Sequence, residues 1–281
     1  MIELEAVTLM RGGRKLIDSI NLKFMRGRVT AILGPNGAGK STVVKVISGE
    51  WPSSGGKVRF CGTDLRRVAP STLAGQRAVV PQSTVLSFPF DVLGVVMLGT
   101  TVPGFGITSD QTHAHKALDD VGLTGFQTRK YTTLSGGERQ RVHIARALCQ
   151  LNASPTTSDD PKALILDEPT ASLDPAHQSI VLEVLQQQAA LGRIVAVVLH
   201  DLNLAAAWAD EIVIMAGGRI EATGTPAQVM TDKVLSAAYN CEMRVNEVPT
   251  NGSVFVLPHH TRGGKRADGV RPEAIAAIGI G

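Results

Sequence analysis

The segment from Gly34 to Ser41, GPNGAGKS, constrains the fold of this chain more than any other part of the sequence. It matches the spacing G-x-x-x-x-G-K-[ST] without a mismatch, which is the spacing of a loop that wraps the phosphates of a nucleotide. Its glycines allow a tight backbone that points successive N–H groups inward at an anion. The lysine can reach the β- and γ-phosphates, and the serine hydroxyl can ligate Mg²⁺. The candidate nucleotide-binding residues are Gly34, Pro35, Asn36, Gly37, Ala38, Gly39, Lys40, Ser41 and Thr42.

The sequence on either side of this loop supports the same interpretation. Residues 28–33 form a short apolar, β-prone run, and residues 41–48 have the pattern of a helix. A strand–loop–helix order places the phosphates at a helix N-terminus, where unpaired N–H groups and the helix dipole favour negative charge. The alternative, a glycine-rich turn that binds nothing, does not explain the full spacing together with these flanks.

Composition narrows the class of protein further. A chain of 281 residues with 43% hydrophobic content can bury a sizeable core. The formal net charge of +3 is small and its basic residues are scattered, so we expect no nucleic-acid partner. The N-terminal residues are acidic rather than basic, and no apolar run approaches the ~20 residues that span a bilayer. We therefore expect a soluble, cytoplasmic chain.

The order of apolar segments predicts two kinds of sheet. Residues 2–10, 16–24, 57–62 and 77–82 are short β-prone segments, which we assign to an antiparallel lobe. From residue 87 to about 150 the pattern becomes helical and indicates an inserted helical region. Apolar runs at 162–167, 194–199 and 212–215 alternate with helices, which implies a mostly parallel sheet covered on both faces. Two short helices are expected within 225–239.

Two adjacent acids, Asp167 and Glu168, lie at the C-terminal end of the apolar strand 162–167. Ligands of open α/β sheets bind at the carboxyl ends of the strands, so these acids are expected beside the phosphate loop. There Asp167 can hold the Mg²⁺ shell, and Glu168 can polarise a water for attack on the γ-phosphate. A solvated Asp-Glu pair is the ordinary interpretation of the dipeptide alone, but not of the dipeptide combined with the upstream loop.

The segment Leu134–Glu138, LSGGE, resembles the signature motif of ATP-binding cassette (ABC) ATPases. The other elements of that family follow in its order over roughly residues 2–225: the phosphate loop, Gln82, the signature, the Asp167–Glu168 pair, a Ser-Leu-Asp turn ending at Asp174, and His200. The resemblance implies an α/β fold with a RecA-like parallel-sheet core, an antiparallel β subdomain and an inserted α-helical subdomain. It places the ATPase domain at 1–240, with the helical insertion at about 87–150, and leaves a C-terminal extension at 241–281. The sequence beyond residue 241 is weakly patterned, and we expect residues 261–281 to be a mobile tail.

The same resemblance assigns roles to the residues. ATP and Mg²⁺ are the implied cofactors. The implied metal-binding residues are Ser41, Gln82 and Asp167. Catalytic roles fall to Glu168, to Gln82 near the lytic water, and to His200 at the γ-phosphate. Ser135, Gly136 and Gly137 open a helix and form a second anion site. In a head-to-tail dimer they complete the partner's nucleotide site, with Asp174 at the dimer seam.

Two further expectations concern single residues. The family usually carries an aromatic side chain near residue 9 that stacks on adenine, whereas this chain has Leu9, Met10 and Arg11. Apolar or guanidinium packing replaces part of that stacking, at a cost of about 1 kcal/mol. The cysteines at 61, 149 and 241 are far apart, and we expect them to be small core residues in a reducing compartment.

Several segments resemble ATPases of importers for iron complexes and cobalamin: residues 73–82, 87–93, 200–206 and 224–226. The combination of Arg77-Ala-Val with Phe88-Pro-Phe90 is most similar to the haemin-importer branch. The implied partners are a second copy of the chain, two copies of a separate permease that docks on residues 83–105, and indirectly a periplasmic haem-binding protein. The implied location is the cytoplasmic face of the inner membrane, where the chain is peripheral. The alternative is import of a ferric siderophore or cobalamin by the same motor.

A cassette protein that acts on ribosomes or DNA is the rival from another class. Such proteins usually carry two cassettes in one chain, or a long coiled coil that splits one cassette. This sequence has one cassette, an ordinary gap from Gln82 to Leu134 and no basic patch, so transport is favoured.

Overall fold

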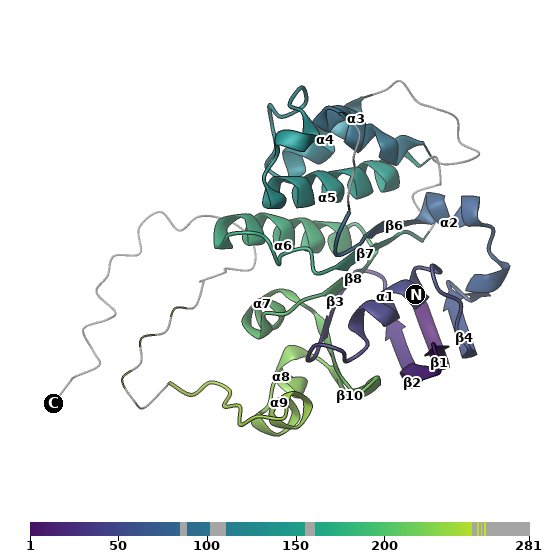
Figure 1. The fold of residues 1–281 in the computed structure, drawn as a ribbon, viewed down its shortest axis with the longest axis vertical. Coiled ribbons are helices and arrows are strands. Elements are labelled where there is room, and N and C mark those ends of the chain that lie inside the picture. Colours follow the sequence, from purple (N-terminus) through teal and green to yellow (C-terminus); the bar gives the residue numbers. More distant parts are fainter. Residues whose placement is uncertain are drawn as a thin grey trace.

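Two sheets of different connectivity organise the chain in the computed structural model (Figure 1). The structure describes residues 1–84, 89–101, 111–154 and 161–248, together with the isolated positions 252, 254 and 256. The strands are β1 (Ile2–Arg11), β2 (Arg14–Phe24), β3 (Arg28–Leu33), β4 (Gly55–Phe60), β5 (Thr63–Asp64), β6 (Arg77–Val80), β7 (Ala163–Asp167), β8 (Ile194–Val198), β9 (Glu211–Ala216) and β10 (Arg219–Gly224). The helices are α1 (Lys40–Ile47), α2 (Pro70–Gln76), α3 (Val92–Met97), α4 (Thr112–Asp120), α5 (Gly136–Ala153), α6 (Pro175–Ala190), α7 (Leu202–Trp208), α8 (Pro226–Val229) and α9 (Asp232–Tyr239), with short 3₁₀ turns at Leu65–Arg67, Leu98–Thr100 and Tyr131–Thr133.

The larger sheet is the predicted mostly parallel core. Its strand order is β10-β9-β3-β8-β7-β6, and only the β9–β10 pairing is antiparallel. Successive residues of a strand face opposite sides of a sheet, and the core follows that rule. Ala31 and Leu33 pack with helices α3–α6, whereas Ile32 packs with α1 and the antiparallel sheet. Both faces are therefore covered, which is why the central strands are apolar throughout.

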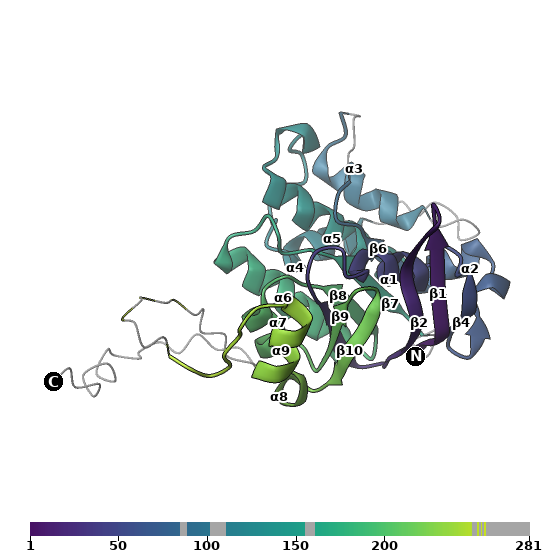
Figure 2. The ribbon, with the colours of Figure 1, turned by 60° about the horizontal axis from the view of Figure 1, so that its bottom comes forward.

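The smaller sheet has the order β2-β1-β4-β5 and is antiparallel, as predicted for residues 2–24 and 57–62. Figure 2 shows β1, β2 and β4 side by side at the edge of the molecule opposite helices α8 and α9. The assignment of residues 77–82 to this lobe is wrong. Residues 77–80 form β6, which pairs in parallel with β7, from Arg77 opposite Ala163 to Val80 opposite Leu166. Helix α2 precedes β6 and carries the chain across to the core sheet, a connection that a four-residue apolar run does not reveal.

The helical region expected from residue 87 to about 150 contains α3, α4 and α5, which pack together above the core sheet (Figure 1). Residues 87–88 and 102–110 of this region lie outside the described part of the chain. Within the described residues, no helix combines the length and the apolar character that crossing a membrane requires. The pair of short helices expected within 225–239 is also present, as α8 and α9.

The cysteine expectation is only partly right. Cys149 is buried in the helical core, but Cys61 and Cys241 are exposed. Cys61 follows β4 in a turn with a backbone φ of +49°, and Cys241 follows the last residue of α9 by two positions. Both positions lie just beyond an element, where a small side chain has no packing layer over it.

A buried histidine that the sequence did not single out stabilises the helical layer. The His143 ring on α5 lies 2.7 Å (Nε2 to Oη) from the Tyr131 hydroxyl, and both residues are 2% exposed. Burial, reinforced by the nearby Arg146 charge, lowers the pKa of His143 from 6.5 to about 4. The ring is therefore neutral in the folded protein at pH values where it is protonated in the unfolded chain.

We expect this histidine to make folding stability depend on pH. Between about pH 6.5 and pH 4 the His143 ring is protonated in the unfolded chain but neutral in the folded protein. The free energy of unfolding therefore decreases as the pH falls through this range. The free energy of unfolding should fall by about 2 kcal/mol between pH 7 and pH 5 from this residue. Urea unfolding of wild type and His143→Gln measures it. His113→Gln on α4 is the control, and an unchanged pH slope in His143→Gln would contradict the assignment.

Candidate nucleotide-binding site

The predicted phosphate loop connects β3 to α1 in the way the sequence indicated. Gly34 has a backbone φ of +144°, and a Cβ at this position would lie 2.1 Å from the Met215 carbonyl oxygen on β9. Gly39 caps α1 with a φ of +99°. The loop is therefore pressed against the neighbouring strand at its start and turns left-handed just before the helix, and both features require glycine.

Lys40 is folded over this loop. Its Nζ donates to the carbonyl oxygens of Gly34 at 2.8 Å and Pro35 at 3.0 Å, and the residue is only 5% exposed. Burial lowers the pKa of Lys40, while the carboxylates of Glu168 and Asp167 raise it. The lysine thus lies within the field of both acids, at the mouth of a loop suited to phosphate.

Glu168 is the centre of a hydrogen-bonded cluster. Its Oε2 accepts from Gln82 Nε2 at 2.7 Å, and its Oε1 lies 2.6 Å from His200 Nε2. The backbone of Glu168 has a φ of +53°, a left-handed conformation that few non-glycine residues adopt and that is common at functional sites. The structure thus brings together the three residues to which the sequence gave catalytic roles.

Asp167 lies at the end of β7 and is 4% exposed. Burial raises the pKa of Asp167, as does Glu168, whereas a hydrogen bond from the Ser41 side chain and the charge of Lys40 lower it. Its Oδ1 is buried and has no hydrogen-bond partner within the part of the chain that the structure describes. A carboxylate oxygen without a donor, beside a serine hydroxyl, is the donor set that Mg²⁺ takes when phosphates supply further ligands.

A cavity of about 480 Å³ lies over the phosphate loop. The loop residues from Asn36 to Thr42 and Glu168 line it, as expected. Four lining residues were not anticipated: Lys15, Leu16, Gly217 and Gly218. Leu16 comes from β2, and the glycines form the turn between β9 and β10, so only the packing of the two sheets brings these residues to the loop. The Gly-Gly pair was the one signal in the sequence that pointed to a close approach of backbone.

The LSGGE segment forms the N-terminus of α5. Ser135 is the N-cap, its hydroxyl accepts from the Glu138 N–H at 3.2 Å, and Glu138 accepts from the Ser135 N–H at 2.7 Å. A Cβ on Gly137 would lie 3.0 Å from the Ser172 carbonyl oxygen. The signature therefore packs against the turn that ends at Asp174, the N-cap of α6.

These signature residues are separate from the cavity over the phosphate loop. Ser135, Gly136, Gly137 and Asp174 are not among the residues that line it. Within the described residues, the cavity over the phosphate loop and the helix N-terminus of the signature thus lie at different places in one chain. The Asp174 side chain accepts from the His177 N–H at 2.9 Å and pairs with the His177 ring.

The residues near position 9 also lie apart from the cavity lining. Leu9 is buried, Met10 is 45% exposed, and the Arg11 guanidinium lies 3.9 Å from the centroid of the Trp51 ring. The apolar side chain that does line the cavity beside the loop is Leu16.

A parallel sheet with a glycine-rich loop leading from β3 into a helix, and acids at the end of β7 in the same sheet, defines a phosphate-loop nucleotide-binding protein. A family model described as "ABC transporter" matches residues 17–171. The chain is 45% identical over 258 residues to "Hemin import ATP-binding protein HmuV" of Rhizobium meliloti (strain 1021), covering 92% of this chain and 98% of that protein. It is 44% identical, with the same coverage, to the protein of that name from Agrobacterium fabrum.

Solved structures agree. A nucleotide-free ATP-binding cassette from an ABC transporter matches with a TM-score of 0.70 and 26% identity, covering 84% of this chain and 95% of that one. A dimeric bacterial ABC transporter cassette matches with a TM-score of 0.70 and 27% identity, covering 80% and 99%. The chain belongs to the ABC transporter family, and its fold is that of the ABC ATPases.

The contact of Gly34 with Met215 can be tested against a matched glycine of the same loop. Gly37 also has a positive φ, +79°, but a Cβ there would meet nothing within 4 Å. We expect Gly37→Ala to cost about 1–2 kcal/mol of unfolding free energy from backbone strain alone. Gly34→Ala should cost about 4 kcal/mol or more, because backbone must move. Urea unfolding of both variants measures the difference, and equal costs would show that the close approach is unimportant.

Proposed function

We propose that this chain is the ATP-binding and ATP-hydrolysing subunit of an ABC importer that carries haemin across the cytoplasmic membrane. The observation that carries the proposal is the placement of Glu168, between Gln82 and His200, beside a phosphate loop. The cargo is supported by identities of 44–46% to relatives named as hemin import ATP-binding proteins, over at least 92% of the chain. Without those relatives the geometry supports the motor but not the cargo.

The proposed roles follow from the geometry. The backbone N–H groups of the loop residues 36–42 and the Lys40 side chain hold the phosphates of ATP, with Gly34 and Pro35 shaping the start of the loop. Ser41, Asp167 and Gln82 hold Mg²⁺, which would supply charge neutralisation at the transferring phosphoryl group. Glu168 takes a proton from the attacking water, and its position is fixed by the Gln82 amide and the His200 ring. The His200 side chain is 44% exposed, so a γ-phosphate bound at the loop could approach its ring.

We further propose that two copies pack head to tail, so that Ser135, Gly136 and Gly137 of each complete the nucleotide site of the other. One related cassette has a dimeric structure. The proposal also explains why the N-terminus of α5, whose N–H groups favour an anion, lies outside the nucleotide cavity of its own chain. Asp174, adjacent to the signature through Ser172 and Leu173, would then lie at the seam.

The remaining parts of the proposal concern assembly. Residues 1–240 form the ATPase domain, with the helical region at about 87–150 as its insertion, and 241–281 form an extension. The dimer binds two permease subunits at the cytoplasmic face of the inner membrane, and a periplasmic haem-binding protein delivers the cargo. The expected docking segment, 83–105, includes the half-exposed residues Phe90 and Leu98; its residues 85–88 and 102–105 lie outside the described part of the chain.

Glu168→Gln tests the proposed base. The amide cannot accept the proton of water, so we expect ATP hydrolysis to fall by at least about 100-fold while ATP binding is retained. The variant should also accumulate as an ATP-bound dimer in size-exclusion chromatography. Glu183→Gln, an exposed substitution on α6, is the control and should match wild type. Wild-type turnover by Glu168→Gln would exclude Glu168 as the base.

Uptake of haemin tests the whole proposal. Proteoliposomes that hold this chain with its copurifying permease should import haemin only when ATP is supplied. Uptake should disappear when the chain carries Glu168→Gln. Robust ATP hydrolysis without haemin uptake would support the proposed ATPase role but contradict haemin as the cargo. The same vesicles can then be tested for uptake of a ferric siderophore or cobalamin.

A further inference from the structure

The turn between β9 and β10, formed by Gly217 and Gly218, makes a backbone hydrogen bond to the phosphate loop. The Gly218 N–H donates to the Ala38 carbonyl oxygen at 3.1 Å. Both glycines of the turn also line the cavity over the loop. The loop is therefore contacted by a segment that lies far along the chain from the strand and helix on either side of it.

This hydrogen bond fixes the direction of one peptide group of the loop. The Ala38 carbonyl and the Gly39 N–H belong to the same trans peptide group, in which the two point in opposite directions. A carbonyl held toward Gly218 thus directs the Gly39 N–H away from the turn. Gly39 is the N-cap of α1, and the N–H groups at a helix start are the donors that bind phosphate.

Gly218 is pressed against β2 as well as against the loop. A Cβ at Gly218 would lie 2.8 Å from the Leu16 carbonyl oxygen, and a Cβ at Gly39 would lie 3.0 Å from the same oxygen. Strand β2, the turn and the phosphate loop therefore meet around one carbonyl group. Gly218 has a backbone φ of +78°, so both the conformation and the space at this position require glycine.

Asp18 on β2 holds the turn from the other side. Its N–H donates to the Gly218 carbonyl oxygen at 2.9 Å, and its carboxylate accepts from Arg219, the next residue of the hairpin, at 2.6 Å. Gly218 is thus hydrogen-bonded through its N–H to the loop and through its carbonyl to β2. The bonds to Asp18 hold the turn in place whether or not a nucleotide is present.

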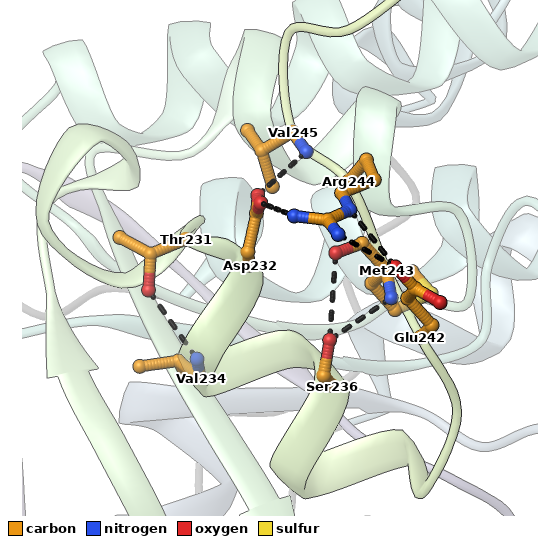
Figure 3. A network of polar contacts seen from close by, with 8 residues as sticks. All are labelled: Thr231, Asp232, Val234, Ser236, Glu242, Met243, Arg244 and Val245. Carbon is orange, nitrogen blue, oxygen red and sulfur yellow. Dashed lines mark hydrogen bonds and ion pairs between the residues drawn. The ribbon is translucent and has the colours of Figure 1, made fainter. Parts of the chain in front are cut away.

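The hairpin that carries the turn lies at the edge of the core sheet, where the C-terminal helices support it. Helices α8 and α9 pack against β9 and β10 (Figure 2). Residues 241–246 fasten α9 in turn, as Figure 3 shows: Arg244 lies 3.3 Å from Asp232, and the Met243 N–H donates to the Ser236 hydroxyl at 2.9 Å. The turn therefore extends to the loop from a hairpin that the rest of the chain holds in place.

We propose that Gly218 is a positioning residue for the phosphate loop: its N–H holds the Ala38 carbonyl so that the Gly39 N–H is directed at the phosphates of the bound nucleotide. The proposal rests on the proposed function, in that ATP is taken as the ligand of the loop. Gly218 acts through the loop rather than through a contact of its own with the nucleotide.

Gly218→Ala tests the proposal, because the added methyl group must push the turn away from Leu16 and so break the bond to Ala38. We expect the dissociation constant for Mg-ADP and the KM for ATP to rise about three- to tenfold, with kcat changed less than about twofold. Gly13→Ala is the matched control. Gly13 is also the second glycine of a Gly-Gly hairpin turn and has a φ of +74°, but a Cβ there meets nothing within 4 Å. It should leave both constants unchanged.

Hydrogen exchange in nucleotide-free protein separates positioning of the loop from crowding of the cavity. Without nucleotide the added methyl group has no ligand to exclude, so a change in the loop reflects the lost support. The Gly39 amide should exchange about three- to tenfold faster in Gly218→Ala and at the wild-type rate in Gly13→Ala.

Two results would overturn the proposal. One is wild-type Gly39 exchange and Mg-ADP affinity in Gly218→Ala; the other is an equal loss of affinity in Gly13→Ala. If Gly218→Ala does not fold, wild-type protein decides. A bond that favours nucleotide binding must itself be favoured by the nucleotide, so saturating Mg-ADP should slow Gly218 amide exchange about three- to tenfold. An unchanged rate would refute the proposal. Wild-type protein that binds no nucleotide would refute the proposed function instead, while Gly39 exchange would still decide the role of Gly218.

Discussion

The parallel pairing of β3, β6, β7 and β8 is the constraint on which the site depends. Parallel strands end at the same edge of a sheet, so the residues that follow them are brought together whatever their separation in sequence. Gly34 follows β3, Gln82 lies two residues after β6, Asp167 ends β7, and His200 lies two residues after β8. The contacts of Glu168 with Gln82 and His200 are the direct result.

Burial of charge at this edge is tolerated because the charges are opposite. Lys40 and Asp167 are each about 95% buried, and an isolated buried charge would be costly. Each shifts the pKa of the other toward its charged form, against the effect of burial. The carbonyl oxygens of Gly34 and Pro35 accept hydrogen bonds from the lysine, whereas Asp167 Oδ1 has no donor among the residues that the structure describes. This unpaired carboxylate oxygen is the atom at which we propose that Mg²⁺ binds.

Close approach of backbones is the second feature that shapes the site. Gly34 against Met215 and Gly137 against Ser172 are positions where a single methyl group would force backbone apart. The first contact fixes the phosphate loop on the sheet, and the second joins the signature helix to the turn after Glu168. Through Ser172 and Asp174, the residues proposed to serve the partner's nucleotide are connected with those that serve this chain's own.

Local patterns predicted most elements but not all of their neighbours. The strands at 28–33 and 162–167 are apolar over their full length, and so their place in a buried parallel sheet follows from the sequence. Residues 77–82 contain only four strand residues, and nothing local distinguishes an antiparallel partner from β7, so the assignment of this segment to the antiparallel lobe was wrong. The sequence did not predict the exposure of Cys61 and Cys241, because each lies just beyond a strand or helix. At such positions the pattern of neighbouring residues does not indicate whether a side chain is buried.

The sequence by itself determined the phosphate loop, the acids after β7, the signature helix and the family, because each depends on residue types at fixed short spacings. Only the tertiary structure decided that Lys15, Leu16 and the Gly217–Gly218 turn line the cavity. The physical reason is that these contacts arise where separate elements pack against one another. No local pattern encodes them, since each side chain has an ordinary place in its own helix, strand or turn.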